Sequence, residues 1–158
     1  MVGQPQPVSM GILEVDNRYL LVEKTADSWD FPGMVGFPAG DVAPGQDPET
    51  AVVEAVDDLT HVVTDTVANL GTIDRIVRRE DGEREFLLHV YELQLVNDSR
   101  PLTQWAFWED EADLEGLEMI PGNLSIYRYL YRKEAYGRYR SVIEKRGGDY
   151  VQTVFRQI

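Results

Sequence analysis

The chain contains no cysteine, which excludes disulfide bonds, thiolate-bound zinc and a cysteine nucleophile. Its only histidines are His61 and His89, too few for a histidine-based metal cluster. No apolar run approaches the roughly 20 residues that a membrane span needs, and the N-terminus lacks the basic-then-apolar pattern of a secretory signal. We therefore expect a cytoplasmic protein without membrane contacts, in which any bound metal ion, Mg²⁺ or Mn²⁺, is held by oxygen atoms.

Lysine is scarce as well, with three lysines beside 12 arginines, and the net charge is −13. A strongly acidic surface repels phosphate backbones, so nucleic acid is not an expected partner. The acidity lies in the first 127 residues, because residues 128–158 hold eight basic and three acidic side chains. An acidic surface with few lysines is also compatible with a salt-loving source, a hypothesis that predicts unfolding in low salt.

The overall composition is that of a folded domain. The 158 residues, 43% apolar and 27% charged, suffice for one domain with a full core, spanning 1–158. Strand-like runs occur at 8–15 and 19–24, around a turn at 16–18, and again at 67–78, 84–96 and 105–108. Asn123 begins an expected C-terminal helical extension, about 123–158, whose helix ends before Gly147-Gly148. This mixture indicates an α/β (α+β) fold.

A further helix is expected after a proline-rich loop, with Asp47 as its N-cap and Pro48 at its first position. Apolar residues then recur at helical spacing and form one stripe: Val52, Ala55, Val56, Leu59 and Val63. Burial of that stripe turns Glu54, Asp57 and Asp58 toward the opposite face. That face is either a solvated acidic surface, as is usual for such residues, or a metal site.

The junction between this loop and this helix, residues 37–59, is the most informative stretch. The loop Phe37-Pro38-Ala39-Gly40 runs through Pro44-Gly45 into the acidic helix. Carboxylates there suit a hard divalent cation, and backbone amides together with the cation suit a diphosphate. The stretch resembles the box of the Nudix hydrolases, G-x5-E-x7-R-E-U-x-E-E-x-G-U.

The resemblance covers about residues 8–130. In chain order it includes the opening hairpin, Trp29-Asp30-Phe31-Pro32-Gly33, His89-Val90-Tyr91-Glu92-Leu93 and Trp108-Glu109-Asp110-Glu111-Ala112-Asp113-Leu114. It implies a Nudix-like α/β/α sandwich with a mixed central sheet and a C-terminal helix. It also implies a hydrolase that uses Mg²⁺ or Mn²⁺ on a nucleoside diphosphate linked to another moiety, and hence a nucleotide-like small molecule as partner.

Two registers align the box with this chain. Without a gap, Gly40 is the first glycine of the box, its three metal-binding glutamates fall on Ala55, Asp58 and Leu59, and His61 stands at its final glycine. Only one carboxylate then survives, which predicts impaired catalysis. The hydrophobic stripe favours this register.

In the alternative register the loop is one residue shorter. Glu54, Asp57 and Asp58 then take the metal-binding positions, and their i, i+3, i+4 spacing puts all three on one helical face. This register restores a metal site but leaves Thr60 at the final glycine of the box.

Other residues complete the candidate site. Glu109 and Glu111 lie near the place where Nudix proteins often supply an additional base. Aromatic residues beside the loops either line a pocket that stacks a nucleobase or pack the core beneath the loops, and the candidate substrate-binding residues are Trp29, Phe37, Gly40 and Trp105.

The C-terminal segment departs from the family pattern, since six tyrosines (127, 129, 131, 136, 139 and 150) interleave with its basic residues. Tyrosine and arginine together suit an interface, and hence a homodimer. The alternative is a helix that packs Ile126, Leu130, Val142 and Ile143 on the core. Three classes remain: a metal-dependent hydrolase, a Nudix-fold nucleotide-binding module that lost the metal, and an interaction protein.

Overall fold

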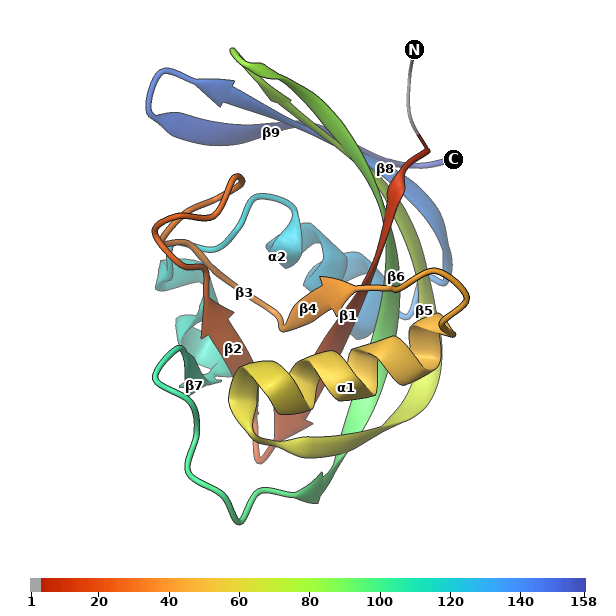
Figure 1. Cartoon of the computed structure of the whole chain (residues 1–158), viewed down its shortest axis with the longest axis vertical. Helices are drawn as coiled ribbons and strands as arrows, with labels where there is room; N and C mark the ends of the chain where they lie inside the picture. Colours follow the sequence, from red (N-terminus) through yellow and green to blue (C-terminus); the bar gives the residue numbers. More distant parts are fainter. Residues whose placement is uncertain (1–3) are drawn as a thin grey trace.

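The computed structural model describes residues 4–158 and shows a curled sheet between helices (Figure 1). The strands are β1 (Gln6–Val15), β2 (Arg18–Glu23), β3 (Val35–Gly36), β4 (Ala39–Asp41), β5 (Val63–Arg79), β6 (Gly82–Asn97), β7 (Ala106–Asp110), β8 (Gly137–Arg146) and β9 (Asp149–Gln157). The helices are α1 (Pro48–Thr60), the 3-10 helix η1 (Glu111–Gly116) and α2 (Asn123–Ile126), which continues into the π-helical segment η2 (Tyr127–Arg132). No helix in this described part is long and apolar enough to cross a membrane.

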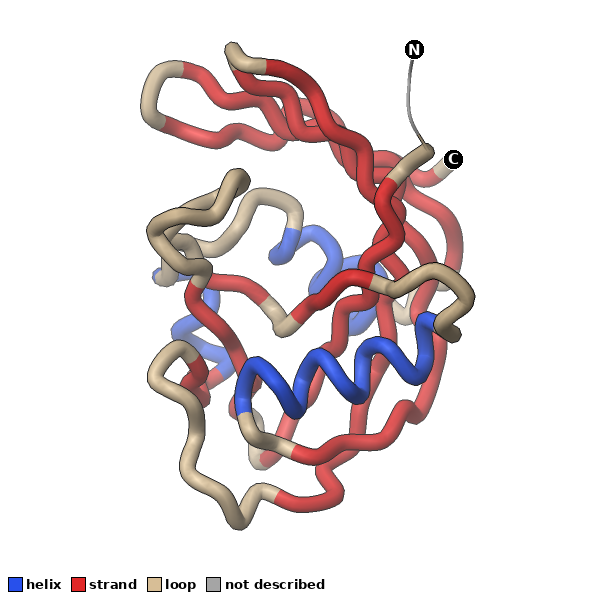
Figure 2. The backbone as a smooth tube through the Cα atoms, viewed as in Figure 1, coloured by secondary structure: helices blue, strands red, loops and turns tan. Residues whose placement is uncertain are grey.

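The sheet is mixed, as the sequence predicts. Its strand order is β3-β2-β1-β6-β5-β8-β9, with β4 beside β1 and β7 beside β2. β1 runs parallel to β6, and β5 runs parallel to β8. Figure 2 shows the long strands β5 and β6 curving away from α1, with the β8–β9 hairpin alongside them.

Each face of the sheet carries its own apolar cluster. On one face, Val52 and Val56 of α1 pack with Leu20 of β2. On the other, Leu21 joins a cluster that includes Ile126 of the C-terminal helix. Neighbouring residues of a strand point to opposite faces, so β2 contributes to both clusters. The result is the expected α/β/α sandwich.

Local sequence signals place the first elements correctly. Asp16 and Asn17 adopt positive φ angles in the turn that joins β1 to β2, as short polar residues do in tight hairpins. Asp47 caps α1 by accepting a hydrogen bond of 3.1 Å from the backbone N–H of Glu49. The expected strands within 67–78 and 84–96 are confirmed as parts of β5 and β6.

The expected apolar stripe of α1 is wrong at Leu59. This side chain is 37% exposed, whereas Thr60 is fully buried. Thr60 tolerates burial because its hydroxyl donates to the carbonyl of Val56 at 2.6 Å and accepts from the N–H of Val62 at 3.1 Å. The buried face of α1 is therefore centred on Val52, Val56 and Thr60 and leaves Leu59 at its margin.

The C-terminal helical extension over about 123–158 is wrong beyond Arg132. A helix does begin at Asn123, but β8 and β9 follow it and form a hairpin around Gly147-Gly148. β8 pairs with β5 and buries Tyr139 and residues 141–143. Burial of the four expected core residues is confirmed, although two of them lie in β8: Ile126, Leu130, Val142 and Ile143.

Candidate functional site

A pocket of about 380 Å³ lies on the face of the sheet that carries α2. We call it the central pocket. Its walls come from β1, β5 and β6, from the loop after β2 and from the start of α2, and they include the apolar side chains of Met10, Phe86 and Leu88. Charged residues of both signs complete its lining: Glu23, Lys24, Asp30, Asp41, Arg75 and Arg84.

A second hollow of about 260 Å³, the helix groove, lies between α1 and β4. Its charged lining is acidic only and consists of Asp41, Glu54 and Asp58. The two hollows adjoin, because Ala39, Gly40, Asp41 and Leu59 line both of them. A ligand in the central pocket can therefore extend toward the acidic face of α1.

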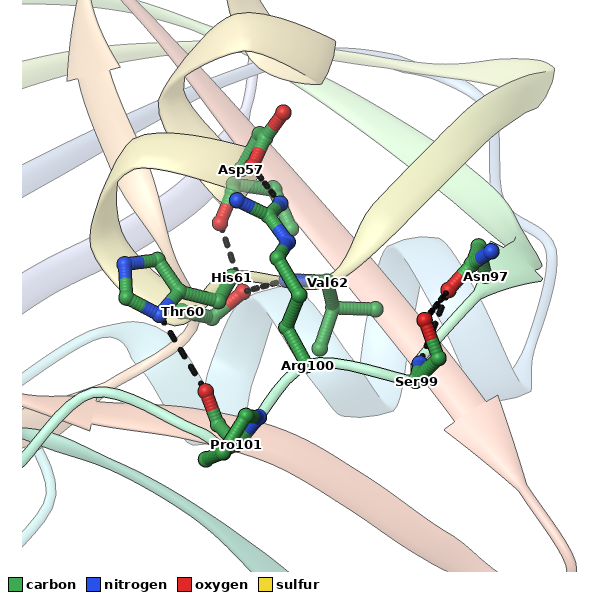
Figure 3. A network of polar contacts seen from close by, with 9 residues as sticks. Asp57, Thr60, His61, Val62, Asn97, Ser99, Arg100 and Pro101 are labelled. Atoms are coloured by element: carbon green, nitrogen blue, oxygen red, sulfur yellow. Dashed lines mark hydrogen bonds and ion pairs between the residues drawn. The ribbon is translucent and has the colours of Figure 1, made fainter.

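The structure separates the three carboxylates that the alternative register brings together. Glu54 and Asp58 line the helix groove, but Asp57 forms an ion pair with Arg100, from the segment between β6 and β7. Figure 3 shows Arg100 reaching across to Asp57 beside the end of α1. The face directed at β4 thus carries Glu54, Ala55, Asp58 and Leu59, which include the three metal-binding positions of the ungapped register and two of the three of the alternative one.

The helix groove holds carboxylates but no preformed cluster of metal ligands. Across residues 4–158, no three acidic or imidazole side chains are placed to hold one metal ion. Glu54 also accepts a hydrogen bond of 2.8 Å from Gln46 Nε2. Since Mg²⁺ takes near-octahedral oxygen coordination and is often bound by one or two carboxylates together with water and phosphate, the acidic residues of the groove would leave most of its positions to such ligands.

Gly40 lets the loop approach α1 closely. A Cβ on Gly40 would lie 2.6 Å from the Cβ of Ala55, a distance that real side chains do not reach. Gly40 can therefore not carry a side chain while residue 55 keeps its place. A glutamate at position 55 would have to direct its carboxylate into the helix groove.

All four predicted substrate-binding residues line the central pocket, but in different ways. Phe37 is 2% exposed and stacks on Tyr127 with ring centroids 6.3 Å apart, so it serves packing. The guanidinium of Arg84 lies 4.1 Å from the ring centroid of Trp29. Trp105 is 41% exposed and stands at the rim of the pocket.

Glu109 and Glu111 lie away from both hollows. Glu109 is in β7, opposite Tyr19 of β2. Glu111 accepts a hydrogen bond of 2.7 Å from the hydroxyl of Tyr127, and burial together with this bond raises the pKa of Tyr127 although a bond from Tyr19 opposes the rise. Neither carboxylate is among the residues that line the central pocket or the helix groove.

Among the lining residues that the sequence reasoning does not propose for the site are Arg75 and Asn123. Arg75 is 7% exposed, and burial lowers its pKa to about 10 although Asp30 opposes that shift. A signal for Arg75 was present, because it alternates with Ile73 and Val77, which places it on the inner face of β5. No comparable signal marked Asn123.

Asp30 is the carboxylate whose charge acts on Arg75, but its hydrogen bonds come from Lys24 and Ser28. Its pKa is lowered: burial alone would raise it, but the charge and hydrogen bond of Lys24, at 2.9 Å, a hydrogen bond from Ser28 and the charge of Arg75 outweigh burial. Asp30 thus acts on Arg75 through its charge, while its ion pair is with Lys24.

Solved structures show what this architecture resembles. The chain superposes on the mutator protein MutT of Bacillus halodurans with a TM-score of 0.67, 13% identity and coverage of 96% of both chains. For MutT of Methanosarcina mazei Go1 the TM-score is 0.67, with 15% identity over 85% of this chain and 99% of that one. For the Nudix domain of Shewanella oneidensis NrtR, solved with ADP ribose, it is 0.66, with 17% identity over 84% and 89%.

The fold of this chain is therefore the Nudix fold, as the sequence resemblance predicts. No family model matches the sequence. No curated protein matches it either.

Proposed function

We propose that the chain is a nucleotide-binding protein of the Nudix fold, with little or no metal-dependent hydrolase activity. The observation that carries this proposal is the lining of the central pocket, where apolar walls and Trp105 stand beside Arg75 and Arg84, while Lys24 is paired with Asp30. Aromatic and apolar surface suits a nucleobase or another flat moiety, and cationic side chains bind an anionic ligand without the help of a metal.

The helix groove supports the second part of this proposal, the low or absent hydrolase activity. Ala55 and Leu59 stand on its α1 face, where the ungapped register expects carboxylates, and Ala55 lies against Gly40. Asp57 is engaged by Arg100 outside the groove. Without a cation, the acidic groove repels phosphate, so the ligand is held mainly by the central pocket.

Calorimetric titration tests the proposal with ADP-ribose, UDP-glucose, diadenosine tetraphosphate and ATP. ADP-ribose is included because the Nudix domain of Shewanella NrtR was solved with it. At least one compound is expected to bind with a Kd on the order of micromolar, and EDTA should leave that Kd unchanged. Arg84→Met should weaken binding about tenfold or more, whereas Arg78→Met, which alters an exposed arginine on the same sheet, should not. Absence of binding across the panel would refute the proposal.

A metal-dependent diphosphate hydrolase is the second candidate. The placement of Glu54, Asp58 and Asp41 around one groove favours it, since a bound phosphate can supply further oxygens to a cation. Incubating the same panel with Mg²⁺ or Mn²⁺ tests it. Product that appears only with metal, and that Asp58→Asn abolishes while Asp57→Asn leaves intact, would replace the binding proposal with this one.

Self-association is a separate proposal for the C-terminal region. β9 ends the sheet and pairs only with β8 within the described chain, and an open edge can accept a strand of a second copy. Light scattering across a concentration series tests a homodimer. A monomer at all concentrations would remove it.

A further inference from the structure

Arg75 has an unusual environment for a charged side chain. Its Nε and Nη2 atoms are buried and have no hydrogen-bond partner within residues 4–158. The guanidinium lies 5.9 Å from the ring centroid of Phe31, and Asp30 is held by Lys24 and Ser28. A buried charge without a hydrogen-bonded partner is costly, so its retention in a pocket points to a ligand.

Asn123 supplies a second unused donor in the same pocket. Its Oδ1 accepts a hydrogen bond of 3.0 Å from the backbone N–H of Phe37, which fixes the orientation of the amide. Its Nδ2 is then left buried and without a partner in the described chain. Arg75 lies beside the residue that precedes Asn123, because its Nη2 is 3.7 Å from the point that a Cβ on Gly122 would occupy, and both residues line the central pocket.

We propose that Arg75 and Asn123 form the inner end of the central pocket and bind an acidic group of the ligand, a carboxylate or a phosphate. The acidic group enters first, the apolar body of the ligand lies along Met10, Phe86 and Leu88, and Trp105 stands over its outer end. This inference rests on the proposed function, and it adds the orientation of the ligand and the chemistry of its inner group.

An acidic group fits this end better than a neutral one. Arg75 and Asn123 offer donors only, and a guanidinium binds a carboxylate or phosphate through two parallel hydrogen bonds. A neutral acceptor would satisfy the hydrogen bonds but leave the charge of Arg75 opposed only by Asp30, which is already paired with Lys24. The acidic lining of the helix groove, by contrast, repels an anion.

Small aromatic compounds test the inner end of the central pocket directly. The protein is titrated with two acids, benzoate and phenyl phosphate, and with the neutral benzamide. Either acid is expected to bind with a Kd on the order of millimolar and at least about tenfold more tightly than benzamide. The tighter of the two acids identifies the group as carboxylate or phosphate. Equal binding of benzamide, or no binding by either acid, would overturn the proposal.

Substitutions at the two donors assign the effect to them. Arg75→Met should abolish the preference for acids and raise the Tm of the ligand-free protein, because it removes an unpaired buried charge. Arg78→Met should change neither. A lower Tm for Arg75→Met, or failure of this variant to fold, would mean that the guanidinium serves the fold and not a ligand.

Asn123→Asp is a second, nearly isosteric variant. It keeps an oxygen for the N–H of Phe37 but replaces the amide donor by an oxygen that repels an anion. It should weaken the acids at least about tenfold and leave benzamide unchanged, and unchanged binding of the acids would contradict the proposal.

The nucleotide panel separates this inference from the proposed function. If benzoate or phenyl phosphate binds through Arg75 but no nucleotide binds, the proposed function fails and the acidic subsite stands. If nucleotides bind equally to the wild type and to Arg75→Met, the subsite fails and nucleotide binding stands.

Discussion

His61 ends α1 in a conformation that most residues avoid. Its φ is 67°, its N–H donates to the carbonyl of Asp57 at 2.8 Å, and its Nδ1 lies 3.1 Å from the carbonyl oxygen of Pro101 (Figure 3). The ungapped register puts the final glycine of the box at this position, and glycine adopts such a conformation without strain. A glycine at this position of the box would therefore meet the need for a positive φ angle at the helix end, and no catalytic role is needed to explain it.

Substitutions at His61 test that explanation. A β-branched valine should lower the free energy of unfolding by about 1–2 kcal/mol, because its side chain clashes with the backbone at positive φ. Glycine and asparagine should stay within about 1 kcal/mol of the wild type. Urea denaturation measures all three variants, and a valine variant as stable as the glycine variant would contradict a strained helix end.

Single residues of the site differ in how well a sequence reveals them. Trp29 is suggested by its aromatic ring beside a loop and Gly40 by its place as the first glycine of the box, and both line the central pocket. Helical spacing groups Asp57 with Glu54 and Asp58 but cannot foresee its ion pair with Arg100, from another loop. Arg75 was overlooked because a single charged residue in a strand does not show whether its charge is compensated.

At the scale of elements, the β8–β9 hairpin replaces the expected end of the C-terminal helix. Tyr139 of β8 stacks on Phe155 of β9 with centroids 5.2 Å apart, and Tyr150 packs on Phe31 at 4.8 Å. Several of the C-terminal tyrosines thus contribute to packing within the chain, whereas Tyr136 is largely exposed.

Truncating one residue of each strand tests the role of the hairpin. Ile143 of β8 is fully buried, so Ile143→Ala should cost about 2–5 kcal/mol of unfolding free energy. Val151 of β9 is exposed, and Val151→Ala should cost about 0.5 kcal/mol or less. Thermal or chemical denaturation compares them, and equal effects would show that β8 is not part of the core.

The elements that were predicted correctly carry local signals, such as the turn at 16–18 and the cap at Asp47. β8 has none of this kind, because its partner β5 lies far away in the sequence. Its tyrosines and arginines fit the margin of a helix equally well. Gly147-Gly148 marks a break, but glycine is common both after a helix and in a hairpin turn, and in the structure it forms a hairpin turn.

At the scale of the whole molecule, the net charge of −13 sets the response to salt. Repulsion among excess carboxylates destabilises the compact state, and salt screens it over about 10 Å at 0.1 M. Raising KCl from about 0.01 to about 1 M at pH 7 should therefore stabilise the protein by roughly 1 kcal/mol or more, which is about 2–4 °C in Tm for a domain of this size.

The same titration near pH 4.5, the isoelectric point, is the control. There the net charge is close to zero, so the stabilisation by KCl should largely disappear. A Tm that ignores salt at pH 7 would remove both this prediction and the hypothesis of a salt-loving source.

The parallel pairing of β1 with β6 also determines when the centre of the sheet can form during synthesis. Residues 6–13 are synthesised about 80 residues before their partners, residues 86–93. Loop closure over such a separation is slow compared with hairpin formation. The nascent chain therefore carries β1 with one edge unpaired until β6 has been made, and an unpaired strand edge is a site of aggregation during that interval.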